Sequence, residues 1–404
     1  MMIDRRALLG TAAASGLLLP SRARAQARTV KLGVLNDQSG PYRDIGGQYG
    51  VAAVKQAVAE FGADFKVEVV SADHQNKPDV AIGIVRQWFD RDGVDIVIDV
   101  PTSSVALAVN SVCKEKNKAY INTGAATGDL TGVQCTPCTI HWSYDTYMLA
   151  KSTGAAMVKA GGNSWYFVTA DYVFGQQLQR DTSGFVTAAG GKVAGASPYP
   201  FPGTTDFSSF LISAQASGAN VLGLANAGAD TINCIKQAAE FGLTRKMKVA
   251  ALLMFINDVH GLGLEAAQGL FLTESFYWDM NDRTRAFTKR FQSFVPGLCP
   301  NMANAGNYAG ALHFLKAVKA LGADKAGDGA TVVAKMKSMP AEDDAFGTTT
   351  IRPDGLAQVP SYLFEVKKPS ESKYPWDYFK TVATTPANEA FRPMAEGGCA
   401  LVKA

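Results

Sequence analysis

Short apolar segments alternate with amphipathic segments from about residue 30 onwards. Apolar residues recurring every three or four positions indicate helices, whereas short valine- and isoleucine-rich runs indicate buried strands. The first series predicts strands at Val30–Leu35, Phe65–Ser71, Asp95–Val100 and Ala119–Thr123, and helices at Ile45–Phe61, Pro78–Phe89, Val105–Glu115 and Tyr147–Lys159. The second predicts strands at Trp165–Thr169, Lys192–Ala196, Val221–Ala225 and Val249–Leu253, and helices at Gln176–Ala189, Phe207–Ala216 and Thr231–Phe241.

Several of these strands, such as Asp95–Val100, are apolar along most of their length. Strands of this kind suit sheets that are covered by helices on both faces. Repeated strand–helix units predict parallel sheets. We therefore expect an α/β protein with two doubly wound parallel-sheet lobes, divided near residue 145.

The last third of the chain changes its pattern. It predicts a strand at Phe271–Phe276, then helices at Thr284–Phe294, Tyr308–Leu321 and Val332–Met339. Beyond them the apolar period becomes two, which indicates strands. We expect Thr348–Ile351 and Tyr362–Val366 to pair as a hairpin across the turn at residues 352–355, followed by a strand near Asp377–Val382.

The first 25 residues have the features of an export signal. Arg5 and Arg6 precede a short apolar stretch that ends at Leu19, and Ala23-Arg24-Ala25 supplies a small-x-small cleavage site. The arginine pair favours the twin-arginine route. The apolar stretch is shorter than the roughly twenty residues that span a bilayer, although an uncleaved anchor is the alternative. The sequence therefore predicts a protein of the periplasm.

Charge and length narrow the function classes. The chain has a formal charge of +3, and four arginines against one aspartate in the signal account for all of it. A neutral mature chain gives no electrostatic reason to expect binding to nucleic acid or to a membrane surface. A length of 404 residues exceeds what one hydrophobic core usually serves, so two domains are expected.

Six cysteines are scattered along the chain. Cys135 and Cys138 have CxxC spacing, but they lie in a turn-rich loop and not at the start of a helix, which favours structural pairing over redox or metal chemistry. Cys113 and Cys234 fall inside amphipathic helices and are expected to be buried free thiols. We expect Cys399 to pair with Cys135, because a short tail needs an anchor.

No catalytic arrangement is evident, and no cofactor or metal site is expected. The four histidines, at positions 74, 141, 260 and 313, show neither a nucleophile elbow nor metal-ligand spacing. His74 follows a strand end and is the strongest functional candidate among them, with a loop hydrogen bond as the simpler role. A solute receptor is favoured over an enzyme or a ligand-sensing module, both of which remain alternatives.

Ligands of open parallel sheets bind beyond the carboxyl ends of the strands. In the first series, these ends carry small and polar residues and one aromatic residue: Tyr42, Thr102, Ser103, Ser104, Ala125, Ala126 and Thr127. Free N–H groups at a helix start would suit a carboxylate. The simpler role of each hydroxyl is to cap a helix.

In the second series, the strand ends are more aromatic. The candidates are Tyr172, Phe174, Asn226, Asp230, Phe255 and Tyr277. Aromatic walls with few polar groups suit a small organic ligand. For Tyr277, packing between the domains is an equally good explanation.

These segments resemble the branched-chain amino acid-binding (type 1, Leu/Ile/Val-binding) family of periplasmic solute-binding proteins that serve ABC importers. The resemblance covers nearly the whole mature chain. It is carried by Val30–Leu35 with Ser39–Tyr42, the helix start at Thr102–Ser104, Ala125–Thr127, Tyr172–Gly175, Asp206–Phe210 and the late Phe346–Gly355 segment. It implies two lobes joined by three crossovers, a ligand in the cleft, and delivery to permease and ATPase subunits in the inner membrane.

The resemblance also implies boundaries and ligand contacts. Lobe I would contain residues 28–145 and 275–350, lobe II residues 146–274 and 351–385, and residues 386–404 would form a tail; we expect a monomer. Ser103 or Ser104, with residues 125–127, would hold the ligand carboxylate. Tyr172 or Phe174 would flank the ligand, and Asn226–Asp230 would follow on lobe II.

One departure from the family bears on the ligand. Amino-acid binders of this family place an acid at the start of the segment that matches Phe255–Asp258, where it holds the ammonium group. Here Phe255 and Ile256 occupy that position. A buried ammonium without a carboxylate is costly, so the chain is more similar to the branch that binds aromatic acids of the benzoate or hydroxycinnamate type. Asp230 or Asp258 could still serve an ammonium, so an amino acid remains the alternative.

Overall fold

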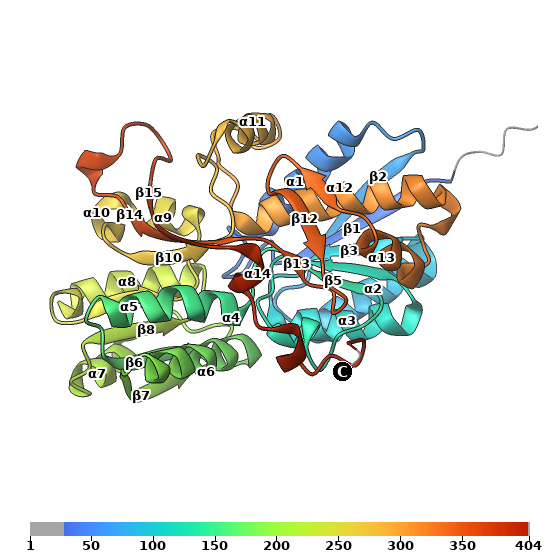
Figure 1. Cartoon of the computed structure of the whole chain (residues 1–404). Helices are drawn as coiled ribbons and strands as arrows, with labels where there is room; N and C mark the ends of the chain where they lie inside the picture. The colour runs from blue at the N-terminus through green and yellow to red at the C-terminus, as the bar shows by residue number, and fades with distance from the viewer. Residues whose placement is uncertain (1–27, 403–404) are drawn as a thin grey trace, which may run out of the picture.

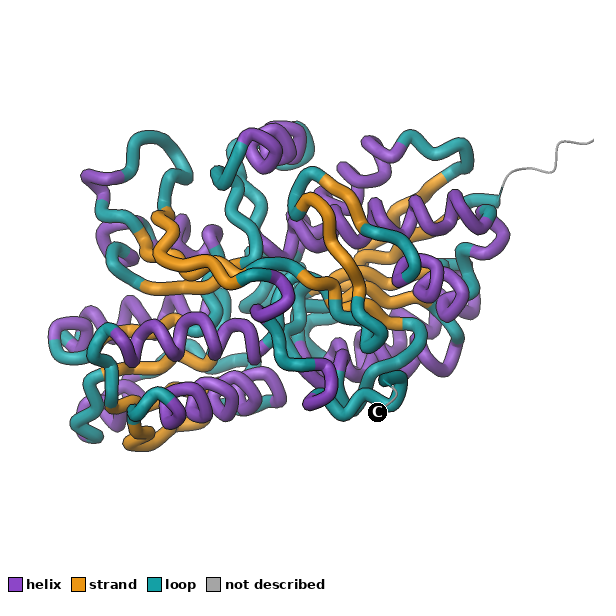
Figure 2. Tube along the Cα trace, in the orientation of Figure 1, coloured by secondary structure: helices purple, strands orange, loops and turns teal. Residues whose placement is uncertain are grey.

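The computed structural model describes residues 28–402. The expected export signal, residues 1–25, lies outside the described residues. Two α/β bodies lie side by side, each with a sheet inside and helices outside (Figures 1 and 2). We call the body around the first sheet lobe I and the body around the second sheet lobe II. The expected fold class is confirmed.

Lobe I is built on a five-stranded parallel sheet of order β2-β1-β3-β4-β5. The strands are β1 (Val30–Asn36), β2 (Val67–Asp73), β3 (Ile96–Asp99), β4 (Ala119–Asn122) and β5 (Thr139–His141). The helices include α1 (Gly47–Phe61), α2 (Pro78–Gln87), α3 (Ser103–Lys116), α12 (Met302–Leu321) and α13 (Gly329–Lys337). All four residues of β3 are buried, as expected for a strand covered on both faces.

Lobe II is built on a seven-stranded sheet of order β15-β14-β10-β9-β8-β6-β7. Its strands are β6 (Ser164–Ala170), β7 (Lys192–Tyr199), β8 (Val221–Ala225), β9 (Lys248–Ala251), β10 (Phe271–Glu274), β14 (Ser361–Val366) and β15 (Phe379–Thr385). Its helices include α4 (Thr146–Leu149), α5 (Ala155–Lys159), α6 (Val173–Ala188), α7 (Ser208–Ala216), α8 (Ala229–Glu240), α9 (Ile256–Leu262) and α10 (Leu264–Ala267). The five central strands are parallel, whereas β14 and β15 are antiparallel.

The expected hairpin between Thr348–Ile351 and Tyr362–Val366 is wrong. The first segment, β12 (Gly347–Ile351), pairs with β11 (Ala341–Asp343) and β13 (Ala357–Gln358) in a small antiparallel sheet. The second, β14, pairs with β10 and β15 of lobe II. Residues 352–356 close a tight turn between β12 and β13, in which the Gly355 N–H donates to the Arg352 carbonyl at 2.9 Å. The expected turn is therefore present but joins other strands, and residues 359–360 lead on to β14 in lobe II.

Two expected helices contain irregular turns. The helix expected at Tyr147–Lys159 consists of α4, a π-helical turn at Ala150–Gly154, and α5. The helix expected at Pro78–Phe89 gives way to a π-helical turn at Trp88–Asp92. This second turn places the Trp88 ring directly over Gly33 in β1, where a Cβ atom would come within 2.5 Å of the ring.

Close packing of Trp88 on Gly33 generates a stability prediction. Gly33→Ala should lower the free energy of unfolding by about 1–3 kcal/mol, because the new methyl group forces the ring out of place. Gly83→Ala in α2 is the matched control, because its methyl group meets no atom within 4 Å and should raise helix stability by up to about 1 kcal/mol. Urea unfolding of both variants checks this; equal effects would contradict the packing argument.

Candidate ligand-binding cleft

The site is built at the point where each sheet reverses its strand order. In lobe I, β1 and β3 are neighbours, but the strand after β1 lies on one side of this pair and the strand after β3 lies on the other. In lobe II, β6 and β8 are related in the same way. A crevice forms beyond the carboxyl ends of strands at such a switch point. The two crevices face each other, so the loops after β1, β3, β6 and β8 all reach one inter-lobe space.

A small cavity of about 10 Å³ occupies that space. Its lining comes from both lobes: Tyr42, Ile45, Pro101, Gly124, Ala126, Tyr144, Tyr172, Phe174, Ala227 and Leu253. This volume holds at most about one water molecule. The lobes are therefore in contact, and a larger guest requires the walls to separate.

Stacked aromatic rings from both lobes meet at the cleft. Phe201, in the loop after β7, stacks on Tyr172 at 4.5 Å and on Tyr42 at 5.2 Å between ring centroids. The hydroxyl oxygens of Tyr42 and Tyr172 lie 2.6 Å apart across the lobes. The N–H of Ala229 adds a backbone bond of 3.1 Å to the carbonyl of Pro41. The closed arrangement is thus stabilised by stacking of apolar ring faces and by a few hydrogen bonds between the lobes.

Backbone strain marks the lobe I wall. Asp99 and Val100 at the end of β3 have φ angles of 88° and 64°, in the left-handed region. For a β-branched valine this conformation is a genuine outlier, and such strain costs about 1–3 kcal/mol per residue. It turns the chain sharply from β3 into α3, so that Pro101 lines the cavity and α3 begins beside it.

The start of α3 offers a buried hydroxyl group. Thr102 is the N-cap residue, and its hydroxyl donates to the Asn76 side chain. Ser103 is 1% exposed, and its Oγ has no hydrogen-bond partner among the residues that the structure describes. Ser104 is half-buried on the next position. A buried hydroxyl beside free helix N–H groups is suited to bind an anion.

Residues 125–127 form a compact turn beside α3. The Asn122 side chain accepts from the Ala125 N–H at 3.1 Å and donates to the Ala125 carbonyl at 2.7 Å. Ala126 lines the cavity. Thr127 caps the 3₁₀ turn that begins at Gly128, where its hydroxyl oxygen accepts from the Asp129 N–H. Thr127 thus has the capping role that was its simpler alternative.

The lobe II candidates separate into two groups. Tyr172 and Phe174 line the cavity. Asn226 is instead engaged within its own lobe by Thr231 and Cys234. The ring of Phe255 is buried and lies edge-on to Tyr144 across the hinge, with 5.8 Å between centroids.

Tyr277 lies apart from the cleft. Its ring packs against Phe364 and Phe379, and its hydroxyl donates to the carbonyl of Trp376 at 3.2 Å. These partners belong to lobe II and its antiparallel strands. Tyr277 therefore packs within lobe II and not between the domains, and it does not line the cavity.

Three buried carboxylates near the cleft are already bound within the protein. Asp230 accepts from the Tyr199 hydroxyl at 2.7 Å, and Asp258 accepts from the Phe255 N–H at 2.9 Å. Glu274 accepts from the N–H groups of Ile256 and Met302. Burial raises the pKa of Asp230 to about 6, that of Asp258 to about 7, and that of Glu274 well above its usual value.

Sequence reasoning missed two rings of the cleft. Phe201 follows the strand end of β7, so the rule of strand ends could have found it. Tyr144 follows β5, which lay inside a segment expected to be loop. Tyr144 donates from its hydroxyl to the carbonyl of Gly124 and so ties the first crossover to the cavity wall.

The four histidines lie in separate environments. His74 is buried and its Nδ1 accepts from the Asn76 N–H at 3.0 Å, which is the loop role weighed above. Burial lowers the pKa of His74 and of His141 to about 4. Within residues 28–402, no three His, Cys, Asp or Glu side chains gather as metal ligands, and no helix is long and apolar enough to cross a bilayer.

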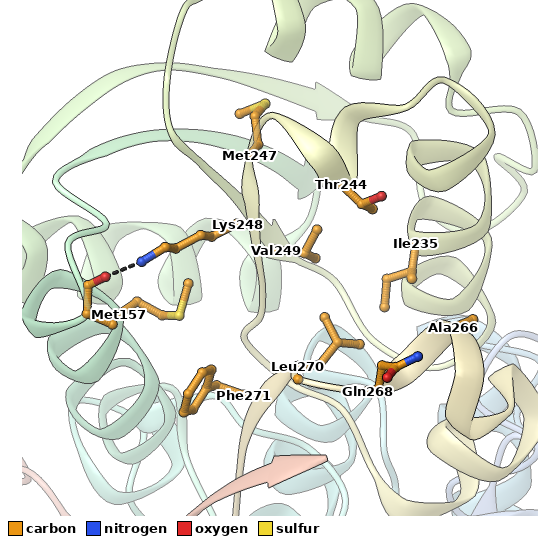
Figure 3. Close-up of a pocket in the computed structure, with 12 residues that line it drawn as sticks. Met157, Ile235, Thr244, Met247, Lys248, Val249, Ala266, Gln268, Leu270 and Phe271 are labelled. Atoms are coloured by element: carbon orange, nitrogen blue, oxygen red, sulfur yellow. Dashed lines mark hydrogen bonds between the residues drawn. The ribbon is translucent and has the colours of Figure 1, made fainter. Parts of the chain in front are cut away.

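A larger cavity lies at the far end of lobe II. Its volume is about 320 Å³, and mainly apolar side chains line it, among them Met157, Ile235, Val249, Leu270 and Phe271 (Figure 3). It sits at the amino ends of β9 and β10, opposite to the cleft. Its polar rim residue Lys248 is already bonded to the carbonyl of Ala160. Ligands of parallel sheets bind at the other end of the strands, so we assign the site to the cleft.

The cysteine expectations are mostly confirmed. Cys135 and Cys399 form a disulfide with 5.6 Å between their Cα atoms. Cys113 and Cys234 are buried free thiols. Cys138 is also free, so the CxxC pair does not close on itself.

Comparison with known proteins agrees with this architecture. The family model described as periplasmic binding protein matches residues 29–373, so the chain belongs to that family. A periplasmic binding protein from Burkholderia mallei is 49% identical, with a TM-score of 0.88 over 93% of this chain and 99% of that one. No curated protein matches the chain.

Two further similar structures are named for different ligands. A branched-chain amino acid ABC transporter periplasmic ligand-binding protein from Burkholderia xenovorans is 39% identical, with a TM-score of 0.79 over 92% of this chain and 99% of that one. A solute-binding protein of an R. palustris ABC transporter, solved with 4-hydroxybenzoate, is 23% identical, with a TM-score of 0.77 over 89% and 97%. At that identity, the second likeness concerns the fold alone.

The buried acid at the start of α9 gives a pH prediction. The folded pKa of Asp258, about 7, exceeds the unfolded value of about 3.9, so its stabilising effect is complete below pH 4 and is lost as the pH rises through 7. Asp258→Asn keeps an oxygen that can accept from Phe255. The free energy of unfolding of Asp258→Asn minus that of wild type should therefore be about 2–3 kcal/mol larger at pH 8 than at pH 5, so the variant gains stability relative to wild type as the pH rises.

Urea unfolding at the two pH values measures this difference. Asp64→Asn is the control, because the Asp64 side chain is 70% exposed. A relative stability of Asp258→Asn that does not change between pH 5 and pH 8 would contradict the raised pKa.

Proposed function

We propose that this protein is the solute-binding component of an ABC importer and that it captures a small aromatic carboxylate of the benzoate or hydroxycinnamate type between its lobes. The observation that carries the proposal is the buried Ser103 hydroxyl at the start of α3, which has no hydrogen-bond partner within residues 28–402 and lies two residues after the cavity-lining Pro101, together with the stacked rings of Tyr42, Tyr172 and Phe201. The first would bind the carboxylate, and the rings would sandwich an aromatic guest.

The bound carboxylates of lobe II support an aromatic acid over an amino acid. Asp230, Asp258 and Glu274 each accept hydrogen bonds from their own surroundings, and burial raises all three pKa values. None of them lines the cavity. An ammonium group in the cleft would therefore lose its water without gaining a free carboxylate, which is unfavourable.

Binding proceeds by opening and closing of the lobes. The tyrosine–tyrosine contact and the Ala229–Pro41 bond must break for the ligand to enter, because the cavity of the closed state is too small for a ring. Closure then re-forms both walls around the guest. The closed shape is what the permease would recognise in the periplasm, where we expect this protein to act.

The second candidate ligand is a branched-chain amino acid. It is favoured by the name of the 39% identical Burkholderia xenovorans protein, a branched-chain amino acid ABC transporter component. For this ligand, Asp230 would have to exchange its bond to Tyr199 for one to the ammonium group.

A ligand panel separates the two candidates. Benzoate, 4-hydroxybenzoate and a hydroxycinnamate should each be tested against leucine and valine by thermal unfolding. A ligand at a hundred times its Kd adds about 2.7 kcal/mol of stability, so a true ligand gives a clear rise in Tm. We expect the rise with aromatic acids alone; a rise with leucine or valine alone would reverse the ranking.

A pair of serine variants tests the carboxylate contact. Ser103→Ala should weaken binding of the ligand by about 1–3 kcal/mol, because it removes a hydrogen bond to a buried charge. Ser111→Ala on the same helix is the control, since its hydroxyl is bonded at 3.1 Å to the Leu107 carbonyl in an exposed position. Isothermal titration measures both; an unchanged Kd in Ser103→Ala would remove this residue from the site.

A further inference from the structure

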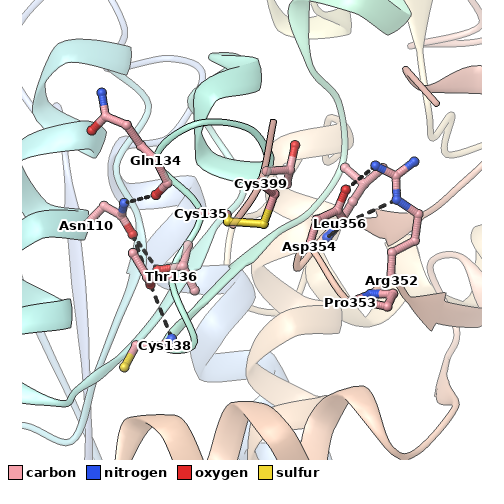
Figure 4. The surroundings of a disulfide bond; sticks show 12 residues. Asn110, Gln134, Cys135, Thr136, Cys138, Arg352, Pro353, Asp354, Leu356 and Cys399 are labelled. Carbon is pink, nitrogen blue, oxygen red and sulfur yellow. Dashed lines mark hydrogen bonds and ion pairs between the residues drawn. A yellow bond between two sulfur atoms is a disulfide. The ribbon is translucent and has the colours of Figure 1, made fainter. Parts of the chain in front are cut away.

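The C-terminal segment makes an additional passage between the lobes. After β15 in lobe II, the chain forms the short helix α14 (Ala387–Ala390) and then runs to lobe I, where Cys399 is bonded to Cys135 (Figures 1 and 4). On the way it contacts the π-helical turn at Ala150–Gly154 and the turn that follows β12. Lys151 donates to the carbonyl of Glu389, and Arg352 donates to the carbonyl of Arg392 at 2.9 Å.

The part of lobe I that this segment holds is the loop of residues 125–138. The loop begins at the cavity wall with Ala126 and reaches the disulfide at Cys135. Arg392 donates from its guanidinium to the carbonyl of Gly128 at 3.1 Å. Gly132 lies so close to the segment that a Cβ atom there would come within 2.7 Å of the Gly397 carbonyl oxygen. The loop is thus held by a covalent bond, a charged donor and backbone packing.

The same loop also touches lobe II in the closed state. Gln177 of α6 donates to the Asp129 carboxylate at 2.9 Å. The Asp129 N–H in turn bonds to the Thr127 hydroxyl oxygen at 3.3 Å, and the Ala126 carbonyl accepts from the Thr146 N–H at 2.9 Å in the first crossover. A displacement of residues 128–135 would therefore move both a cavity wall and an inter-lobe bond.

We propose that the C-terminal segment is a latch that positions the 125–138 loop for ligand binding, with Arg392 as a positioning residue. The latch acts through the loop and does not itself line the cavity. It fixes the backbone of Ala125–Thr127 before the ligand arrives, so less conformational freedom is lost on binding. The effect on affinity rests on the proposed function, whereas the ordering of the loop does not.

Two independent variants release the latch. The double substitution Cys135→Ser/Cys399→Ser removes the covalent bond, and Gly132→Ala forces the segment away from the loop by steric conflict. Gly83→Ala, in the same lobe, is the control, because its methyl group meets no atom within 4 Å. The use of two mechanisms keeps the test valid if one variant does not fold.

Hydrogen exchange of the ligand-free protein is the first measurement. The amides of residues 125–131 should lose protection in both variants while those of β1 and β3 keep it. Wild-type protection of residues 125–131 in the folded variants would overturn the latch. This result does not depend on any ligand, so a wild-type protein that binds nothing in the panel would refute the proposed function and leave this test decisive.

Affinity for the aromatic acid is the second measurement, made with variants that circular dichroism shows to be folded. Both variants, and Arg392→Ala, should bind roughly 2- to 30-fold more weakly, the range expected for residues that act through a neighbouring element. A role in stability alone predicts an unchanged Kd at a temperature where all proteins are folded. Unchanged affinity in all three variants would overturn the positioning role.

Discussion

The buried side chain of Glu274 ties the two lobes together at the hinge. It is the last residue of β10 in lobe II, and it accepts from the N–H of Ile256 at 2.9 Å and from that of Met302 at 3.2 Å. Ile256 begins α9 in lobe II and Met302 begins α12, which packs in lobe I against α1. One buried side chain thus accepts from the first N–H groups of helices in both lobes. These two bonds lower the pKa of Glu274, but burial has the larger effect and raises it.

The hinge matters because the cleft walls are formed by loops. Each wall is held from behind by a hydrogen-bonded sheet, whereas three stacked rings and a few hydrogen bonds join the walls. The strained Asp99–Val100 backbone lies at the end of β3 in the lobe I sheet. Strain of this kind persists only where the surrounding sheet enforces it, and here it aims the start of α3 at the cleft.

The sequence predicted the alternation of strands and helices because continuous apolar strands and amphipathic helices leave strong local signals. It failed where a distant partner decides the structure. β14 looks like the second arm of a hairpin, yet its partners are β10 and β15, which lie about 90 residues before it and just after it. β5 is only three residues long, and too short for a periodic signal.

The same limit applied to the site. Tyr42, Ala126, Tyr172 and Phe174, chosen from strand ends, line the cavity, because parallel topology brings those ends to one edge. Strand ends could not show that Tyr277 turns into the lobe II core, since this depends on Phe364 and Phe379 from a later part of the chain. The pairing of Cys399 with Cys135 was expected because a short tail needs an anchor, and the structure contains this disulfide.

The aromatic cleft also decides how lobe closure can be observed. The five tryptophans of the chain are Trp88, Trp142, Trp165, Trp278 and Trp376, and none of them lines the cavity. Indole emission from the native protein therefore reports on the interiors of the lobes and the hinge. Phe201, stacked between two tyrosines that belong to opposite lobes, is the position at which an introduced fluorophore would sense the guest directly.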